Sequence, residues 1–115
     1  MDDSIFQTIK DLLDVNPDDN AFDANILTYI NSAFYSLRQL GVGPRNGFVL
    51  TKETTWGSFL EDESLISEVK LYIQLRVRLI FDPPQNSFLV TSIENQIKEV
   101  EWRLNAHAEG ALDDE

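Results

Sequence analysis

Two groups of carboxylates have the residue types that metal or acid–base chemistry would need. The first is a run of alternating acidic and amide side chains: Asp14, Asn16, Asp18 and Asn20. A calcium-binding loop of this kind also needs glycine at its sixth position and glutamate at its twelfth. This chain has Asp19 and Asn25 at those positions. The pattern therefore indicates an acidic turn that leads into a helix, not a calcium site.

The second group is Glu61-Asp62-Glu63, which precedes an expected helix. Adjacent acids point in different directions, and acids at this place suit the positive end of a helix dipole. The chain has no cysteine, and His107 is its only histidine. Sequence motifs for a serine nucleophile, a phosphate loop, a dinucleotide or zinc do not occur either. We therefore expect no enzyme activity, no metal site and no cofactor.

The charge of the chain is strongly negative and unevenly placed. Its 9 lysines and arginines stand against 20 acids, for a net charge of −11. Residues 1–23 have a single base, Lys10, and the last residues, 109–115, have none. Such a balance argues against a nucleic-acid clamp, which needs basic residues to displace phosphate counterions. No apolar run is long enough to span a membrane, so we expect a soluble, cytoplasmic protein.

Apolar residues recur at helical spacing in most of the chain, which predicts an all-α bundle. Helices are expected over residues 3–14, 23–40, 64–81 and 86–106, with a short one over 56–60. Residues 64–81 are apolar over more than half of the helix circumference, which is typical of a central helix. Asp23 is expected to cap the second helix, and Gly41 is expected to end it.

Residues 41–55 break the helical pattern and are expected to form an arm, either a loop or a short β-hairpin. Its apolar centre, Phe48, Val49 and Leu50, is expected to be exposed and to dock on another protein. The alternative is an arm that folds back on its own domain. A long loop with an apolar centre favours the docking interpretation.

From residue 108 onward the chain is acidic and interrupted by glycine. Such a segment is expected to be loose unless a partner holds it. The predicted organisation is therefore one helical domain over residues 1–107, followed by an acidic tail over residues 108–115.

Four side chains are candidates for contact with another subunit: Tyr35, Arg76, Phe88 and Trp102. Arg76 lies within the apolar arc of its helix, so it either pairs with a carboxylate of its own chain or anchors a subunit interface. Phe88 and Trp102 lie off the main apolar stripe of the last long helix. They either pack against another helix of their own chain or become buried against a neighbouring subunit.

One stretch is specific enough to suggest a family. The third long helix ends in Phe81-Asp82-Pro83-Pro84, and the fourth contains Glu99, Glu101-Trp102-Arg103-Leu104. Further matching positions are Leu75 to Ile80, Ser87-Phe88, Gln96-Ile97, Ile30 to Ala33, Gly41-Val42 and Trp56. The pattern resembles the head–tail connector (adaptor) family of long-tailed double-stranded DNA phages.

The resemblance implies a small helical adaptor of the virion without enzymatic activity. Such proteins form a ring, commonly of twelve copies, below the portal protein. The ring docks a head-completion (stopper) or tail protein and lets DNA pass without sequence-specific binding. The candidates for portal contact would then be His107, at the end of the domain, and Glu109 and Leu112 in the tail. The location implied is the head–tail interface, with the host cytoplasm as the place of assembly.

Two other functions are alternatives for a small acidic helical protein. An acidic inhibitor that mimics DNA would spread its carboxylates over a continuous surface, whereas the acids here concentrate at the two ends. A metal-dependent hydrolase would need carboxylates at helical spacing that face the core. Glu94 with Lys98, and Glu99 with Arg103, instead have the spacing of surface ion pairs.

Overall fold

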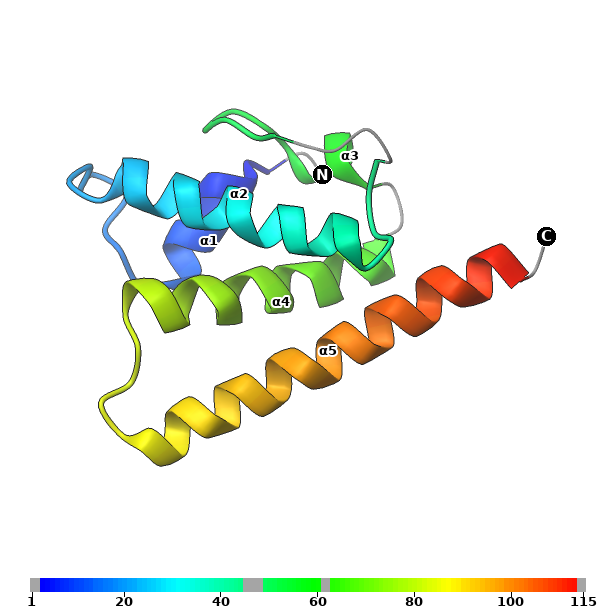
Figure 1. The fold of residues 1–115 in the computed structure, drawn as a ribbon. Helices are drawn as coiled ribbons and strands as arrows, with labels where there is room; N and C mark the ends of the chain where they lie inside the picture. Colours follow the sequence, from blue (N-terminus) through cyan, green and yellow to red (C-terminus); the bar gives the residue numbers. More distant parts are fainter. Residues whose placement is uncertain (1–2, 45–48, 61–62, 114–115) are drawn as a thin grey trace.

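The computed structural model describes residues 3–44, 49–60 and 63–113, and within them every regular element is an α-helix (Figure 1). The helices are α1 (Ile5–Leu12), α2 (Asp23–Gln39), α3 (Trp56–Phe59), α4 (Glu63–Phe81) and α5 (Ser87–Asp113). The predicted all-α fold with four main helices and one short helix is therefore confirmed.

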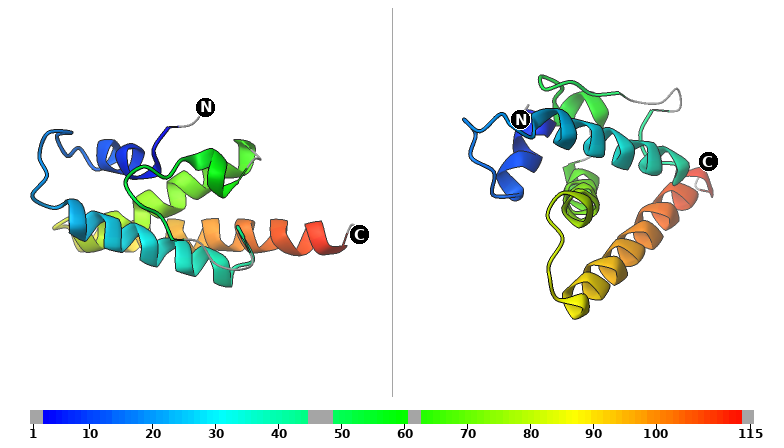
Figure 2. Two further views of the ribbon diagram at one scale, coloured as in Figure 1. Left: turned by 90° about the horizontal axis from the view of Figure 1, so that it is seen from above. Right: turned by 60° about the vertical axis from the view of Figure 1, so that its left-hand side comes forward.

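Helix α4 lies in the middle of the molecule. Helices α1 and α2 pack on one side of it, and α5 crosses its other side and extends beyond its N-terminal end (Figures 1 and 2). The buried side chains of α4 include Val69, Tyr72, Ile73 and Val77, all without exposed surface. A helix with neighbours on several sides has to be apolar around most of its circumference. The prediction that this segment is the central helix is confirmed.

The other helices each contribute one apolar stripe to the same core. The residues with no or almost no exposed surface are Ile5 and Ile9 of α1, Ile26, Ile30 and Leu37 of α2, and Val100 and Leu104 of α5. Burial of this apolar area supplies the main driving force of folding. Its continuity across α1, α2, α4 and α5 makes the described helices one unit.

Local signals set the start of α1 and the end of α2. Ser4 caps α1, because its hydroxyl oxygen accepts a hydrogen bond from the amide of Gln7 at 3.2 Å. Helix α2 ends at Gln39, and Gly41, two residues later, turns the chain away with a φ of +87°. The amide of the next residue, Val42, donates to the carbonyl of Leu37 at 3.0 Å. This is a Schellman motif, and the prediction that Gly41 ends the helix is confirmed.

Two expectations about the elements were wrong. Asp23 does not cap α2, because it is the first residue of that helix and its carboxylate pairs with two lysines instead. The loose tail is not found either, since α5 continues to Asp113 without a break at residue 108. The arm was expected to be either a loop or a short β-hairpin. Its residues 41–44 and 49–55 contain no strand, Thr55 makes only an isolated bridge to Ser4, and positions 45–48 lie outside the described residues.

Candidate assembly surfaces

The part of the arm that leads into α3 is fixed to the helices. Leu50 is only 2% exposed, so the expectation that it is available for docking was wrong. The side chain of Asn31, on α2, explains this. Its Nδ2 donates to the carbonyl of Leu50 at 3.2 Å, and its Oδ1 accepts from the amide of Leu50 at 3.0 Å. With its backbone satisfied in this way, Leu50 can be buried in the core.

Residues 52–56 continue this attachment along α1. The hydroxyl of Ser4 donates to the carbonyl of Lys52 at 2.7 Å, and the amide of Ile5 donates to the carbonyl of Thr54 at 2.9 Å. The indole of Trp56 donates to the hydroxyl of Thr8 at 3.1 Å. At this end the arm folds back on its own domain, which was the alternative expectation. Of the remaining docking candidates, Val49 is 84% exposed and Phe48 lies outside the described residues.

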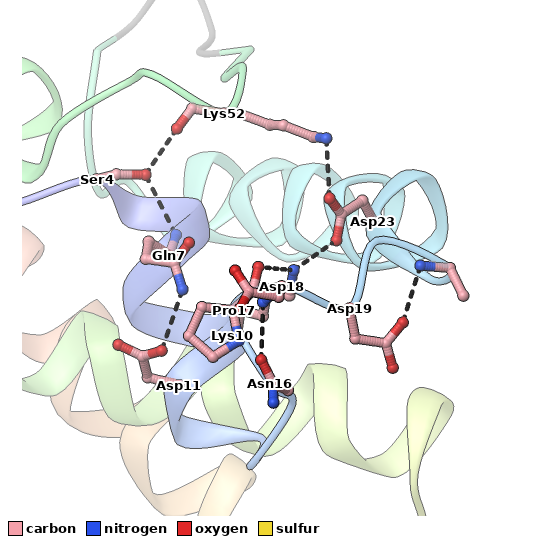
Figure 3. A network of polar contacts seen from close by, with 11 residues as sticks. Ser4, Gln7, Lys10, Asp11, Asn16, Pro17, Asp18, Asp19, Asp23 and Lys52 are labelled. Carbon is pink, nitrogen blue, oxygen red and sulfur yellow. Dashed lines mark hydrogen bonds and ion pairs between the residues drawn. The ribbon is translucent and has the colours of Figure 1, made fainter.

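A charged cluster reinforces the same attachment (Figure 3). The carboxylate of Asp23 lies 2.9 Å from Nζ of Lys10 and 2.9 Å from Nζ of Lys52. Lys10 is 1% exposed and also donates to the carbonyl of Pro17 at 3.2 Å. Both lysines lie over the ring of Phe6, with Nζ 5.8 Å and 5.5 Å from its centroid. The cluster thus joins α1, α2 and the arm through one carboxylate.

The electrostatics of this cluster follow from its contacts. Hydrogen bonds from Lys52 and Lys10 lower the pKa of Asp23, against the opposing effect of burial. A buried lysine needs such a partner, because an unpaired charge in the core is costly. The role of this cluster was missed in the sequence. The available signal was that Lys10 is the only base among the first 23 residues.

The loop between α1 and α2 is an acidic turn, as predicted. Oδ1 of Asn16 accepts from the amide of Asp18 at 2.8 Å, and Oδ1 of Asp19 accepts from the amide of Ala21 at 3.0 Å (Figure 3). Side chains that bond to their own backbone in this way shape turns. Across the described part of the chain, no group of three or more potential ligands could hold a metal ion.

The outer face of α5 carries the largest exposed aromatic side chains. Phe88 is 79% exposed and Trp102 is 72% exposed, so neither packs into the core of its own chain. Counted at about 100° per residue, both lie on the side of α5 opposite its buried stripe. On α2, Tyr35 is 61% exposed. These three subunit-interface candidates are therefore accessible for contact with a neighbouring molecule.

The fourth candidate, Arg76, has a partner within the chain. Its Nη1 lies 3.1 Å from the hydroxyl of Tyr72 and 3.5 Å from a carboxylate oxygen of Glu101. The hydroxyl of Tyr72 donates to the same carboxylate at 2.8 Å. Burial, and then this hydrogen bond, raise the pKa of Tyr72 to about 12. The expected pairing of Arg76 with a carboxylate is confirmed, and the guanidinium helps to join α4 to α5.

A second ionic contact joins the same two helices. Arg103, on α5, lies 3.2 Å from Glu68 on α4 and 2.9 Å from Glu99 one turn away. The hydrogen bonds that Arg103 donates to the carboxylate of Glu68 are the main reason why the pKa of Arg103 is raised. The predicted ion pair of Glu99 with Arg103 is confirmed, while Glu68 was missed because it is distant in sequence.

Beside these contacts, α4 and α5 enclose a shallow hollow of about 290 Å³. Its lining consists of Arg76 from α4 together with Glu94, Ile97, Lys98 and Glu101 from α5. The hollow is mixed in character, because an apolar side chain lies between two bases and two acids. No sequence signal marks it, since it depends on how α5 crosses α4.

The candidates for portal contact lie on the C-terminal part of α5. His107 and Glu109 are exposed there, whereas the side chain of Leu112 lies outside the described residues. Their helix extends past the N-terminal end of α4 (Figures 1 and 2). Asn105 still contacts the end of α2, where its amide donates to the carbonyl of Leu40 at 3.3 Å, and the helix projects beyond that contact. The two described candidates are therefore open to a partner.

Comparison with known proteins identifies the family. A family model described as phage connector protein matches residues 5–111, which is nearly the whole chain. Comparisons with curated proteins and with solved structures found no match. In the described residues no helix is long and apolar enough to cross a membrane. On the match to residues 5–111, the chain belongs to the phage connector protein family.

Proposed function

We propose that this protein is a head–tail adaptor that forms a ring below the portal of a phage head. Its family gives it a structural role as a head–tail connector, and the match over residues 5–111 is the observation that carries the proposal. In the ring it docks a head-completion or tail protein on the side away from the portal. Assembly takes place in the host cytoplasm and needs no catalysis.

The exposed aromatic residues support self-assembly. Trp102 and Phe88 lie on the outer face of α5, while the inner face of the same helix packs on α4. Aromatic side chains are the usual anchors of protein interfaces. A ring needs two different surface patches that meet around the circle. Tyr35 on α2 and the exposed Val49 of the arm are candidates for further contacts in the assembly.

The charge of the chain supports passage of DNA through such a ring. A net charge of −11 makes the protein repel phosphates, so that DNA slides through and does not adhere. Salt at ordinary ionic strength largely screens this repulsion beyond a Debye length of about 10 Å, so the repulsion acts mainly on DNA close to the protein. The ring would therefore act as a conduit without sequence-specific contacts.

The C-terminal part of α5 is the proposed contact with the portal. Helix α5 projects beyond α4, and His107 and Glu109 are exposed on it. A projecting helix can insert between subunits of a partner, where an amphipathic face meets a groove. Leu112 would belong to the same contact.

Sedimentation with the cognate portal assembly tests this function. The purified protein should co-sediment with the portal in a density gradient, in a fixed ratio that saturates. An acidic protein of similar size and unrelated fold serves as the control for non-specific binding through charge. If the protein stays at the top of the gradient over a range of salt concentrations, it does not bind the portal and the proposed function is wrong.

A further inference from the structure

The hollow between α4 and α5 is suited to a single side chain. Small-molecule sites usually enclose about 300–1,000 Å³, and this open hollow has about 290 Å³. Ile97, which is 9% exposed, provides its apolar surface. The hollow lies at the lower end of this range and is open to solvent, and it has room for one large side chain.

The polar groups of the hollow match an indole. Arg76 lines it with a side chain that is 32% exposed, and a guanidinium plane stacks well on an aromatic ring. Glu94 and Glu101 supply carboxylate oxygens, which can accept the indole N–H. A buried tryptophan needs such an acceptor. The lining thus combines an apolar floor, a stacking cation and an acceptor.

Trp102 is the exposed indole of this chain that could occupy such a place. The other tryptophan, Trp56, is buried and donates to Thr8. Trp102 does not line the hollow of its own chain. At about 100° per residue it lies roughly 80° around α5 from Glu94 and 140° from Ile97. The indole and the hollow therefore face different directions on one helix.

We propose that Trp102 of one copy inserts into the α4–α5 hollow of the next copy. This inference rests on the proposed ring and specifies its interface. The occupant is a second copy because each copy carries both complementary parts on different faces. In the proposed ring, each copy gives its Trp102 to one neighbour and offers its hollow to the other, so the contact repeats in one direction around the circle. Arg76 would then both join α4 to α5 and stack on the neighbour's indole.

Fluorescence quenching tests the burial of the indole. The Trp56→Phe variant leaves Trp102 as the sole tryptophan, and acrylamide should quench it several-fold less after assembly on the cognate portal. The Trp102→Phe variant is the matched control, because its remaining indole is buried already and its quenching should not change. If Trp102 stays equally accessible while the variant assembles, the inference is wrong and the proposed function stands.

Cross-linking tests where the indole goes. The chain has no cysteine, so single-cysteine variants give unambiguous products. Ala106→Cys, one turn from Trp102, should link to Glu94→Cys of a second copy through a short bismaleimide when the two variants are mixed and assembled. Thr28→Cys, exposed on α2, replaces Ala106→Cys in the control and should not link.

The cross-linking result and the assembly of the wild-type protein test the contact and the proposed function separately. Equal linking in both mixtures, or none in assembled material, overturns the proposed contact while the ring remains. If wild-type protein does not assemble on the portal at all, the proposed function fails and the contact fails with it.

Discussion

Asn31 holds Leu50 by both of its backbone groups. The amide side chain donates to the carbonyl at 3.2 Å and accepts from the amide at 3.0 Å, as a neighbouring β-strand would. One side chain of α2 thereby replaces the backbone partners that the arm lacks. Leu50 becomes part of the core, and Val49 beside it remains exposed.

Removing the amide of Asn31 should release this part of the arm. The Asn31→Ala variant leaves two backbone groups of Leu50 without partners, which costs about 1–3 kcal/mol in free energy of unfolding. Urea denaturation measures the loss, and hydrogen exchange should speed up at the amide of Leu50. Thr28→Ala, on an exposed position of the same helix, should change the stability by about 0.5 kcal/mol at most. Unchanged exchange at Leu50 would show that the core alone holds the arm.

The arm also shows where prediction from sequence stops. The periodicity of apolar residues predicted the four long helices and the central place of residues 64–81, because each long helix buries a face that its own pattern displays. The burial of Leu50 depends on Asn31, which lies in another element, and no local pattern reveals such a pair. The attachment of the arm was therefore left open between two alternatives.

Charge pairs were predictable only at short range. Glu99 and Arg103 are one helical turn apart, so their spacing alone indicated the pair. Lys52 and Asp23 are 29 residues apart and meet only because the arm folds back. The expectation that Asp23 caps a helix failed because the sequence does not show this distant contact. Its residue type and position suited a cap, but tertiary contacts used the carboxylate differently.

Protonation of Asp23 at acidic pH should lower the stability of the fold. Its pKa is lowered in the folded state, so its contribution to stability is complete above the ordinary carboxyl pKa near 4 and is lost as the pH falls below that. Lys52 is the main cause of the lowered pKa. The Lys52→Met variant should therefore begin acid unfolding at a higher pH than wild type.

Circular dichroism during acid titration measures this shift. Lys98→Met removes the same charge from an exposed position of α5 and should leave the midpoint close to that of wild type. Equal shifts in both variants would mean that net charge, and not the contact with Asp23, controls acid stability.

Alkaline pH should weaken the junction of α4 and α5. The pKa of Tyr72 is raised to about 12, against about 10 for an unfolded tyrosine. A raised pKa contributes stability that is complete below pH 10 and is lost as the pH rises from 10 to 12. The stability of wild type should fall more steeply across that range than the stability of Tyr72→Phe. Tyr35→Phe, at an exposed position, should keep the wild-type slope, and a Tyr72→Phe slope as steep as that of wild type would contradict the assignment.

Substitutions of the two tryptophans should affect different properties, Trp56 the stability of the fold and Trp102 the assembly of the ring. Trp56→Ala removes a core side chain and should lower the free energy of unfolding by about 3–5 kcal/mol. Trp102→Ala changes an exposed side chain, so we expect a change in stability within about 0.5 kcal/mol but loss of ring formation. Urea denaturation and light scattering measure the two effects. Rings of normal stability formed by Trp102→Ala would remove this residue from the interface.

The C-terminal part of α5 should be needed for binding the portal and not for folding. A chain that ends at His107 keeps Val100 and Leu104, the last fully buried residues among the described side chains of α5. We expect it to unfold at nearly the same urea concentration as wild type and to bind the cognate portal at least tenfold more weakly. Surface plasmon resonance measures the binding. Undiminished affinity would exclude Glu109 and Leu112 from the contact.

Electron microscopy of the protein mixed with its cognate portal assembly tests the central claim most directly. The account predicts a ring of this protein seated on the portal, with a continuous channel, and each subunit alone serves as the control. Neither ring nor complex over a range of salt concentrations would contradict it. The family membership would then describe the chain's ancestry and fold, but not its assembly.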